Sequence, residues 1–266
     1  MAPHLQSIAR TYDLAADHFD QLPFWHVFGA RTVARLALPR GGRVVDLCCG
    51  SGASALPAAR AVGPTGQVTG IDISPGLIAV ARARAAQAAL PQATFDCADV
   101  TAVHRPAGSL DAVISVFGLF FVDDMAALLR RAWHWLAPGG VLAITVWGPE
   151  VLAPGEAWFW EAALRERPDL ATAGHAARLD SSGKLRQVFA DAGLPEPDIT
   201  PDRWLMPLES PEAFWPVILG TSNRRTLEAL SPDAQARVRA EVTARLAVGQ
   251  VSALTLDVLY ATLRRP

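Results

Sequence analysis

Short apolar runs alternate with alanine-rich and leucine-rich stretches along the first part of the chain. Residues 44–47 and 68–73 are apolar runs that each contain an aspartate. Residues 53–62 and 77–90 follow them and consist mainly of good helix formers. This order predicts strand, helix, strand, helix, which is the pattern of a βαβ unit.

The alternation continues through the rest of the chain. Residues 110–117 are predicted as a fourth strand, residues 136–144 as a turn followed by a fifth strand, and residues 203–208 as a sixth strand. Residues 252–263 alternate apolar and polar positions, which is typical of an edge or antiparallel strand. We therefore expect an α/β fold of the doubly wound type, with helices on both faces of a mostly parallel sheet.

Two regions outside these strands have a different pattern. Residues 1–40 contain several aromatic side chains and a helical run over residues 28–38, which ends before a proline and two glycines. Residues 211–249 hold two predicted helices and precede the last strand, so we interpret them as an inserted helical cap. The whole chain, 1–266, is expected to form a single domain.

Composition and charge restrict the class of protein. Of the 266 residues, 51% are hydrophobic, which is enough for a large core. The formal net charge of −2 does not favour a nucleic-acid partner. The longest strongly apolar run, 112–122, is far shorter than the roughly 20 residues that cross a bilayer. Residues 1–10 lack the apolar core of a secretory signal, so we expect a cytoplasmic protein without a membrane span.

A glycine turn directly after the first predicted strand indicates a ligand site. Gly50 and Gly52 let the backbone turn tightly and approach a ligand closely. Asp46 would repel a phosphate there, so an amino acid moiety whose ammonium faces this carboxylate fits better. Asp72, at the end of the second strand, is placed to hydrogen-bond ribose hydroxyls. Two alternatives stay open: the glycines could serve only as a turn, and Asp72 only as a helix N-cap.

Residues 41–150 resemble the core of class I S-adenosylmethionine-dependent methyltransferases, and within them the small-molecule branch of the ubiquinone and menaquinone methyltransferases. The family's acid-x-Gly-x-Gly-x-Gly motif corresponds to Asp46, Cys48, Gly50 and Gly52, with Cys48 in place of the first glycine. The resemblance implies S-adenosyl-L-methionine as the cofactor and a seven-stranded sheet whose last hairpin adds an antiparallel strand. The cofactor-binding residues that it implies are Asp46, Leu47, Cys48, Gly50, Gly52, Asp72, Ile73, Asp99, Val100, Ser115 and Val116.

Among these residues, Ile73 is expected against the adenine face and Asp99 at the adenine edge. Asp96 lies three residues before Asp99, and either aspartate could instead be a solvated loop acid. The three cysteines show no metal-ligand spacing, so no metal is expected. Their scarcity favours a reducing compartment.

The resemblance also implies that residues 1–40 fold over the cofactor as a helical lid. This makes Tyr12 and Trp25 candidate lid residues, although both could merely dock the segment on the core. With Phe120, Phe121 and Trp147 they form the predicted substrate pocket, which favours an apolar or aromatic small-molecule acceptor.

The expected activity is methyl transfer to oxygen or carbon, because the segment after the fourth strand lacks the Asn/Asp-Pro-Pro-Tyr pattern of amino-group methylation. His26 and His175 are the candidates for a general base, although a lone loop histidine is more often structural. One alternative is an S-adenosylmethionine-binding enzyme of the cyclase type that transfers no methyl group. Another is an NAD-dependent oxidoreductase, which would normally carry a third glycine where this chain has Ala55. The acceptor, the oligomeric state and the pathway stay open.

Overall fold

A seven-stranded sheet runs through the computed structural model, which describes residues 3–170 and 175–266. Its strand order is β3-β2-β1-β4-β5-β7-β6, and the first five strands pair in parallel. Strand β7 lies antiparallel between β5 and β6. The sequence prediction of a mostly parallel, doubly wound sheet with an antiparallel final hairpin is confirmed. The strands are β1 Arg43–Leu47, β2 Gln67–Asp72, β3 Ala93–Cys97, β4 Leu110–Val116, β5 Leu136–Ala153, β6 Asp198–Pro207 and β7 Ala253–Arg264.

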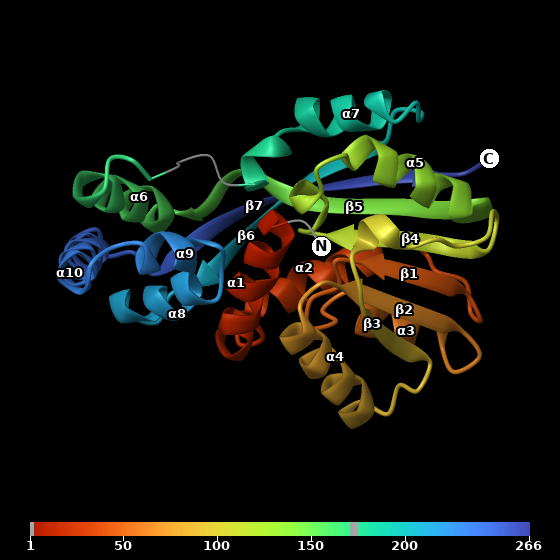
Figure 1. Cartoon of the computed structure of the whole chain (residues 1–266), viewed down its shortest axis with the longest axis horizontal. Coiled ribbons are helices and arrows are strands. Elements are labelled where there is room, and N and C mark those ends of the chain that lie inside the picture. Colours follow the sequence, from red (N-terminus) through yellow and green to blue (C-terminus); the bar gives the residue numbers. More distant parts are fainter. Residues whose placement is uncertain (1–2, 171–174) are drawn as a thin grey trace.

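Helices cover both faces of this sheet (Figure 1). The α-helices are α1 Pro3–Phe19, α2 Pro23–Ala34, α3 Ala55–Val62, α4 Pro75–Gln87, α5 Met125–Trp135, α6 Gly155–Glu166, α7 Ser182–Asp191, α8 Phe214–Leu219, α9 Asn223–Glu228 and α10 Pro232–Val248. Single 3-10 turns are η1 Val100–Ala102, η2 Leu119–Phe121, η3 His175–Arg178 and η4 Pro211–Ala213.

The alternation of side chains along the central strands divides the core between two layers. In β1, Val44 belongs to the apolar cluster that includes residues of α3 and α4, whereas Val45 and Leu47 belong to the cluster that includes residues of α5 and α7. Ala112 and Val113 of β4 divide in the same way. In Figure 1, α5 and α7 accordingly lie above the sheet and α3 and α4 below it. Both faces of the strands are therefore buried, as a parallel sheet requires.

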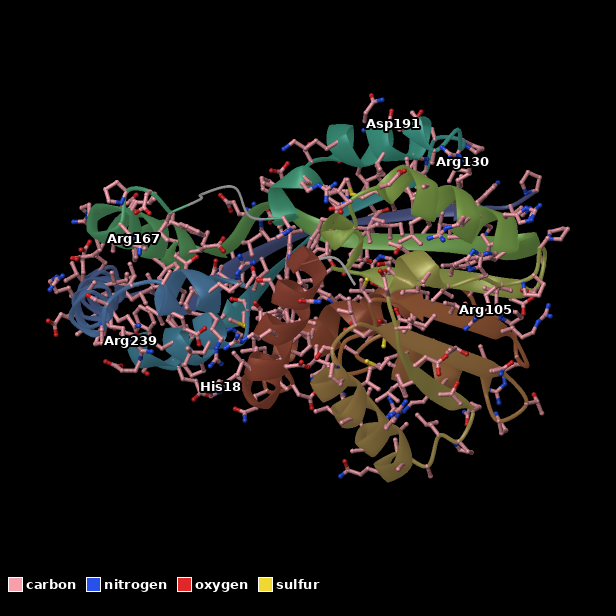
Figure 2. All side chains as sticks on the ribbon, viewed as in Figure 1. His18, Arg105, Arg130, Arg167, Asp191 and Arg239 are labelled. Atoms are coloured by element: carbon pink, nitrogen blue, oxygen red, sulfur yellow. The ribbon has the colours of Figure 1, made fainter. Side chains whose placement is uncertain are left out.

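The two outer helices of the upper layer are also joined to each other. Arg130 of α5 donates a hydrogen bond of 3.3 Å from its guanidinium to the backbone carbonyl of Asp191 at the end of α7. Figure 2 shows these two side chains on the outer surface of that layer. The two helices of this layer are therefore fixed to each other as well as to the sheet.

Strands β1 and β4 are neighbours, but their following helices lie on opposite faces of the sheet. The chain leaves β1 toward α3 on one face and leaves β4 toward α5 on the other. Such a divergence opens a crevice at the carboxyl ends of the strands, where open α/β sheets bind their ligands. The predicted site residues follow β1, β2, β3 and β4 and therefore meet at this edge.

Four local predictions are wrong in their extent. The sixth strand, predicted over residues 203–208, begins earlier, at Asp198. The helix predicted over residues 28–38 begins earlier, at Pro23, because proline favours the first turn of a helix. The fifth strand does not end before Trp147, because that residue pairs with Val258 of β7 and the strand continues through a bulge to Ala153. Segment 211–249, all of which the structure describes, forms three α-helices rather than two.

The helices outside the sheet gather at one end of the molecule. Helix α10 packs on α6, and α1 packs on α4, α8 and α9. In Figure 1, α6, α8, α9 and α10 lie together beyond the carboxyl end of β5, and α1 stands between this group and the sheet. Helix α1 thus borders both the strand edge and the group of cap helices.

Candidate active site

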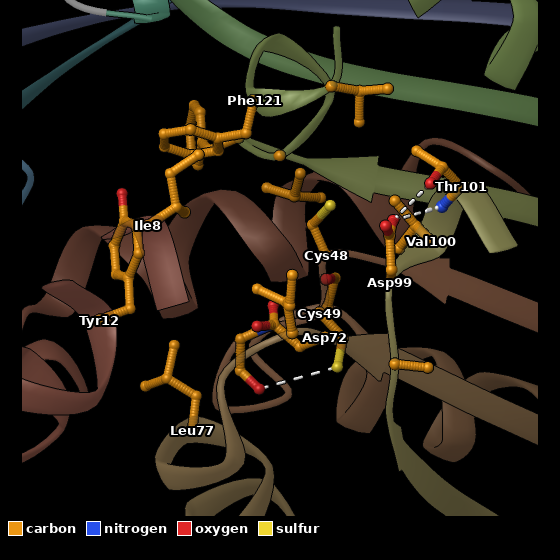
Figure 3. A pocket seen from close by; sticks show the side chains of 18 of the residues that line it. Ile8, Tyr12, Cys48, Cys49, Asp72, Leu77, Asp99, Val100, Thr101 and Phe121 are labelled. Carbon is orange, nitrogen blue, oxygen red and sulfur yellow. Dashed lines mark hydrogen bonds between the residues drawn. The ribbon is translucent and has the colours of Figure 1, made fainter. Parts of the chain in front are cut away.

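The first cavity, of about 400 Å³, opens at the carboxyl ends of β1, β2 and β4. Figure 3 shows Ile8 and Tyr12 of α1 on one side of it and Asp99 with Thr101 on the other. The turn after β1 and the end of β2 lie between these two sides. Predicted cofactor residues that line this cavity are Cys48, Gly50, Asp72, Ile73, Asp99, Val100 and Val116.

The floor of this cavity is a turn with left-handed backbone conformations. Gly50 has φ +53°, and Cys48 has φ +59°, a conformation that residues with a Cβ rarely adopt. Gly118, in the loop after β4, lies against this turn, since a Cβ built on it would come within 2.2 Å of the Cβ of Cys48. The two loops therefore touch, and only glycine fits between them.

Asp72 is held rigidly at the edge of the turn. Its carboxylate accepts hydrogen bonds of 2.9 Å from the backbone nitrogens of Gly50 and Ser74, one on each oxygen. Burial raises the pKa of Asp72, and these two backbone hydrogen bonds oppose that rise. Each carboxylate oxygen can accept a second hydrogen bond. The side chain is thus fixed in position and still able to receive a pair of neighbouring hydroxyl donors.

Of the two aspartates after β3, the structure brings only Asp99 to the cavity. Its Oδ1 accepts hydrogen bonds from the backbone nitrogen of Thr101 at 2.8 Å and from its hydroxyl at 2.7 Å. Asp96 is exposed and does not line the cavity. The arrangement favours Asp99 over Asp96 as the partner of a base edge.

Asp46 lies beneath the turn rather than on the cavity surface. Its side chain is 0% exposed, and Ser54, which does line the cavity, donates a hydrogen bond of 2.6 Å to Oδ2. The other oxygen, Oδ1, is buried without a partner among the described residues. Burial raises the pKa of Asp46 to about 7. Its contact with an ammonium group stays a prediction, as do the roles of Leu47, Gly52 and Ser115, which do not line this cavity either.

A second cavity, of about 300 Å³, lies beside the first. Tyr12, Trp25, Phe117 and Phe121 line both cavities and so form the wall between them. All five residues of the predicted substrate pocket lie around this second cavity. They are Tyr12, Trp25, Phe120, Phe121 and Trp147.

The shared wall is made of packed aromatic rings. Phe117 stacks on Trp147 with ring centroids 3.8 Å apart, and Trp25 lies 5.8 Å from the same indole. Burial raises the pKa of the Tyr12 phenol, so this side chain stays protonated at neutral pH. The buried indole N–H of Trp25 has no hydrogen-bond partner among the described residues. The wall is therefore apolar with two hydrogen-bond donors.

The two candidate bases lie in different places. His26 lines neither cavity, because its Nδ1 faces a guanidinium nitrogen of Arg84 at 3.2 Å and its Nε2 faces the backbone oxygen of Asp20 at 3.0 Å. Since an arginine can only donate, Nδ1 of His26 accepts and its basic nitrogen is already used. His175 does line the second cavity, with its ring 5.1 Å from that of Phe121.

Helix α1 is attached to the cofactor side by a contact that the sequence did not indicate. Oδ1 of Asp13 accepts hydrogen bonds from the hydroxyl of Ser74 at 2.5 Å and from the backbone nitrogen of Gly76 at 3.0 Å. Ser74 also caps α4 by accepting from the backbone nitrogen of Leu77. Asp13 therefore holds α1 over the edge of the first cavity.

Sequence reasoning also missed residues of both cavities. Phe117 follows the fourth strand directly, and its place at a strand end could have indicated it. Ser54 lies two residues after Gly52, at the N-cap position of α3, and carried a weaker signal of the same kind. Glu156 and Asn223, which line the second cavity, carried none.

Comparison with known proteins shows the family to which this chain belongs. The model of a methyltransferase domain matches residues 44–140. A trans-aconitate 2-methyltransferase of Variovorax paradoxus (strain S110) is 31% identical over 218 residues, which cover 80% of this chain and 81% of that protein. The chain belongs to the S-adenosylmethionine-dependent methyltransferases. Membership in this family decides against an NAD-dependent oxidoreductase.

Two further likenesses were found for this methyltransferase. The aklanonic acid methyltransferase DauC of Streptomyces sp. (strain C5) is 34% identical over 142 residues, which cover 53% of this chain and 64% of that protein. The crystal structure of the [4+2]-cyclase SpnF superposes with a TM-score of 0.62 over 100% of this chain and 98% of that one. Because the two sequences are only 20% identical, this structural likeness shows a shared fold alone.

The first cavity fits the cofactor of the family, S-adenosylmethionine. Asp72 and Asp99 present carboxylate oxygens at its edge, and the glycines of the floor leave room that side chains would fill. The unpartnered Oδ1 of Asp46 is a buried acceptor suited to a cationic group. Among the described residues no three side chains gather to hold a metal ion, and no helix is long and apolar enough to cross a membrane.

Proposed function

We propose that this methyltransferase methylates an oxygen or carbon atom of a small, largely apolar molecule bound in the second cavity. The observation that carries the proposal is the shared wall of Tyr12, Trp25, Phe117 and Phe121. Two cavities that share lining residues lie next to each other, so a donor in one and an acceptor in the other would meet at their common boundary. Such a reaction needs no covalent intermediate on the protein.

The chain's own residues would bind and orient the two reactants. Asp72 would accept from the ribose hydroxyls and Asp99 from the adenine edge, while Asp46 would face the ammonium group. Bound S-adenosylmethionine supplies an electrophilic methyl carbon. The aromatic wall would then align the acceptor within about 3–3.5 Å of that carbon and exclude water.

The lining of the second cavity favours an aromatic acceptor. The relatives are named for aklanonic acid, for demethylmenaquinone and for trans-aconitate. Among the described residues that line this cavity there is no lysine or arginine, whereas aromatic rings form much of its surface. A tricarboxylate would need cationic partners in such a place. We therefore propose an acceptor of the aromatic or quinone kind.

Several further assignments belong to this proposal. Residues 1–40 would act as a lid over the cofactor and residues 211–249 as a cap over the acceptor, within one domain. His175 stays the candidate base for an acceptor hydroxyl, because it lines the acceptor cavity. A cytoplasmic location fits the free thiols of the three cysteines, and the net charge of −2 fits a partner other than nucleic acid.

The proposal is tested by binding and by product analysis. Calorimetry should show binding of S-adenosylmethionine and S-adenosylhomocysteine. Incubation with a panel of naphthols, naphthoquinols and hydroxyanthraquinones should release S-adenosylhomocysteine together with a product that is heavier by one methylene. An acceptor that is converted without release of S-adenosylhomocysteine would indicate the cyclase-type alternative instead. Failure of S-adenosylmethionine to bind would refute the proposal.

A further inference from the structure

A polar pair stands in the otherwise aromatic second cavity. Glu156 lies in the first turn of α6, and Asn223 is the first residue of α9. The amide nitrogen of Asn223 donates a hydrogen bond of 2.7 Å to Oε1 of Glu156. Both residues line the second cavity, and Asn223 is only 7% exposed. A buried amide and a half-buried carboxylate held together in this way form a built site rather than a solvated surface.

The hydrogen-bonding capacity that this pair offers to a ligand is mostly that of an acceptor. An ionised carboxylate only accepts, so the amide of Asn223 must turn its nitrogen toward Glu156. This leaves the oxygen of Asn223 and Oε2 of Glu156 as acceptors, beside the second N–H of the same amide. Burial raises the pKa of Glu156 and the hydrogen bond from Asn223 opposes that rise. A ligand group that donates a hydrogen bond would complement the pair, whereas an anion would be repelled.

The position of the pair separates it from the transfer chemistry. Glu156 and Asn223 line the second cavity but not the first, whereas the reactants must meet at the wall that both cavities share. His175 and Asp180 are the other described ionisable residues that belong to the second cavity alone, and Asp180 forms an ion pair of 2.8 Å with Lys184. The pair is thus placed to hold a part of the acceptor that is not methylated.

We propose that Glu156 and Asn223 bind a phenolic or enolic hydroxyl of the acceptor, remote from the methylated atom, and exclude acceptors that carry a carboxylate at that position. This inference rests on the proposed function, because it assigns the second cavity to the acceptor. Glu156 and Asn223 are then positioning residues that select the substrate.

The test compares two probes that share one ring system. 2-Naphthol carries a hydroxyl donor and 2-naphthoate carries a carboxylate at the same position. Their binding to the protein saturated with S-adenosylhomocysteine is followed by calorimetry. The wild-type protein should bind 2-naphthol at least about tenfold more tightly than 2-naphthoate, and Glu156→Gln should reduce this ratio to about threefold or less. Glu161→Gln is the matched control, since Glu161 is an exposed acid of the same helix that pairs with Arg245.

The outcomes separate this inference from the proposed function. A wild-type ratio below about threefold, no binding of 2-naphthol, or an unchanged ratio in Glu156→Gln overturns the inference. If Glu156→Gln does not bind S-adenosylhomocysteine, Asn223→Ala is tested in its place. This variant should weaken 2-naphthol binding at least about threefold. An unchanged affinity for 2-naphthol overturns the inference. If the wild-type protein does not bind S-adenosylhomocysteine, the proposed function fails. In turnover with a hydroxynaphthalene that the wild-type protein methylates, Glu156→Gln should raise KM and leave kcat nearly unchanged.

Discussion

Replacing Asp46 by asparagine removes one buried carboxylate from beneath the cofactor turn and nearly preserves its shape. Oδ2 of Asp46 accepts the hydrogen bond from Ser54, and an asparagine oxygen can accept the same bond. The change therefore isolates the effect of the negative charge. The substitution therefore distinguishes two roles of Asp46: binding a cationic ligand through its charge, and supporting the turn through its shape and its hydrogen bond.

The magnitude follows from the pKa of Asp46, which burial raises from 3.8 to about 7. Between these values the folded chain binds more protons than the unfolded chain, so stability falls as pH rises and is constant above about pH 7. The part of this window between pH 5 and pH 7 corresponds to about 3 kcal/mol, since each pH step of one contributes about 1.4 kcal/mol. Without cofactor, Asp46→Asn should therefore gain about 3 kcal/mol over the wild-type protein between pH 5 and pH 8.

Urea unfolding at pH 5 and pH 8 measures this difference, and calorimetry at pH 8 measures the cofactor side. Because an ammonium group favours the ionised carboxylate, Asp46→Asn should bind S-adenosylmethionine at least about tenfold more weakly. Asp96→Asn, a change at an exposed aspartate, should alter neither quantity. A stability difference that does not depend on pH would refute the burial argument. Unchanged cofactor affinity would refute the predicted contact with the ammonium.

Three other changes test other parts of the cofactor site. Asp99→Asn should weaken S-adenosylmethionine binding about tenfold in calorimetry and Asp96→Asn less than twofold; equal effects would contradict the role of Asp99. Gly118→Ala places a Cβ 2.2 Å from that of Cys48. Thermal unfolding should therefore show a loss of about 1–3 kcal/mol in stability, and calorimetry should show weaker cofactor binding. A neutral result would mean that the two loops move apart. Asp13→Ala removes two hydrogen bonds that hold α1, so stopped-flow measurements should show several-fold faster cofactor release; an unchanged rate would show that α1 does not act as a lid.

The cofactor half of the site was predictable because its signals are local. Alternating apolar residues and alanine-rich stretches determine the order of strands and helices, and Ser74 caps α4 as its sequence position indicates. Gly50 and Asp72 meet because parallel neighbouring strands bring their carboxyl ends together, and a backbone hydrogen bond joins them. The sequence interval between them is a single βαβ unit.

Long-range pairing determined what the sequence did not reveal. Strand β5 continues past Trp147 because β7, more than a hundred residues later, pairs with it. Glu156 and Asn223 are 67 residues apart and belong to different helices, so no spacing could have joined them. Asp46 was expected at the cavity surface, but the turn that follows it covers its side chain completely. An interaction between Asp46 and a bound ammonium group would therefore be electrostatic and would act from beneath the cavity surface.

The division between the two cavities also limits what relatives can reveal about the acceptor. The methyltransferase domain model covers residues 44–140, which include the turn, Asp72 and Asp99. The polar residues of the second cavity, Glu156 and Asn223, lie beyond that range. A relative that matches this chain only over the domain therefore carries information about the cofactor and little about the acceptor. The proposed function therefore assigns substrate choice to α6, α9 and the aromatic wall, and experiments on those side chains test that assignment directly.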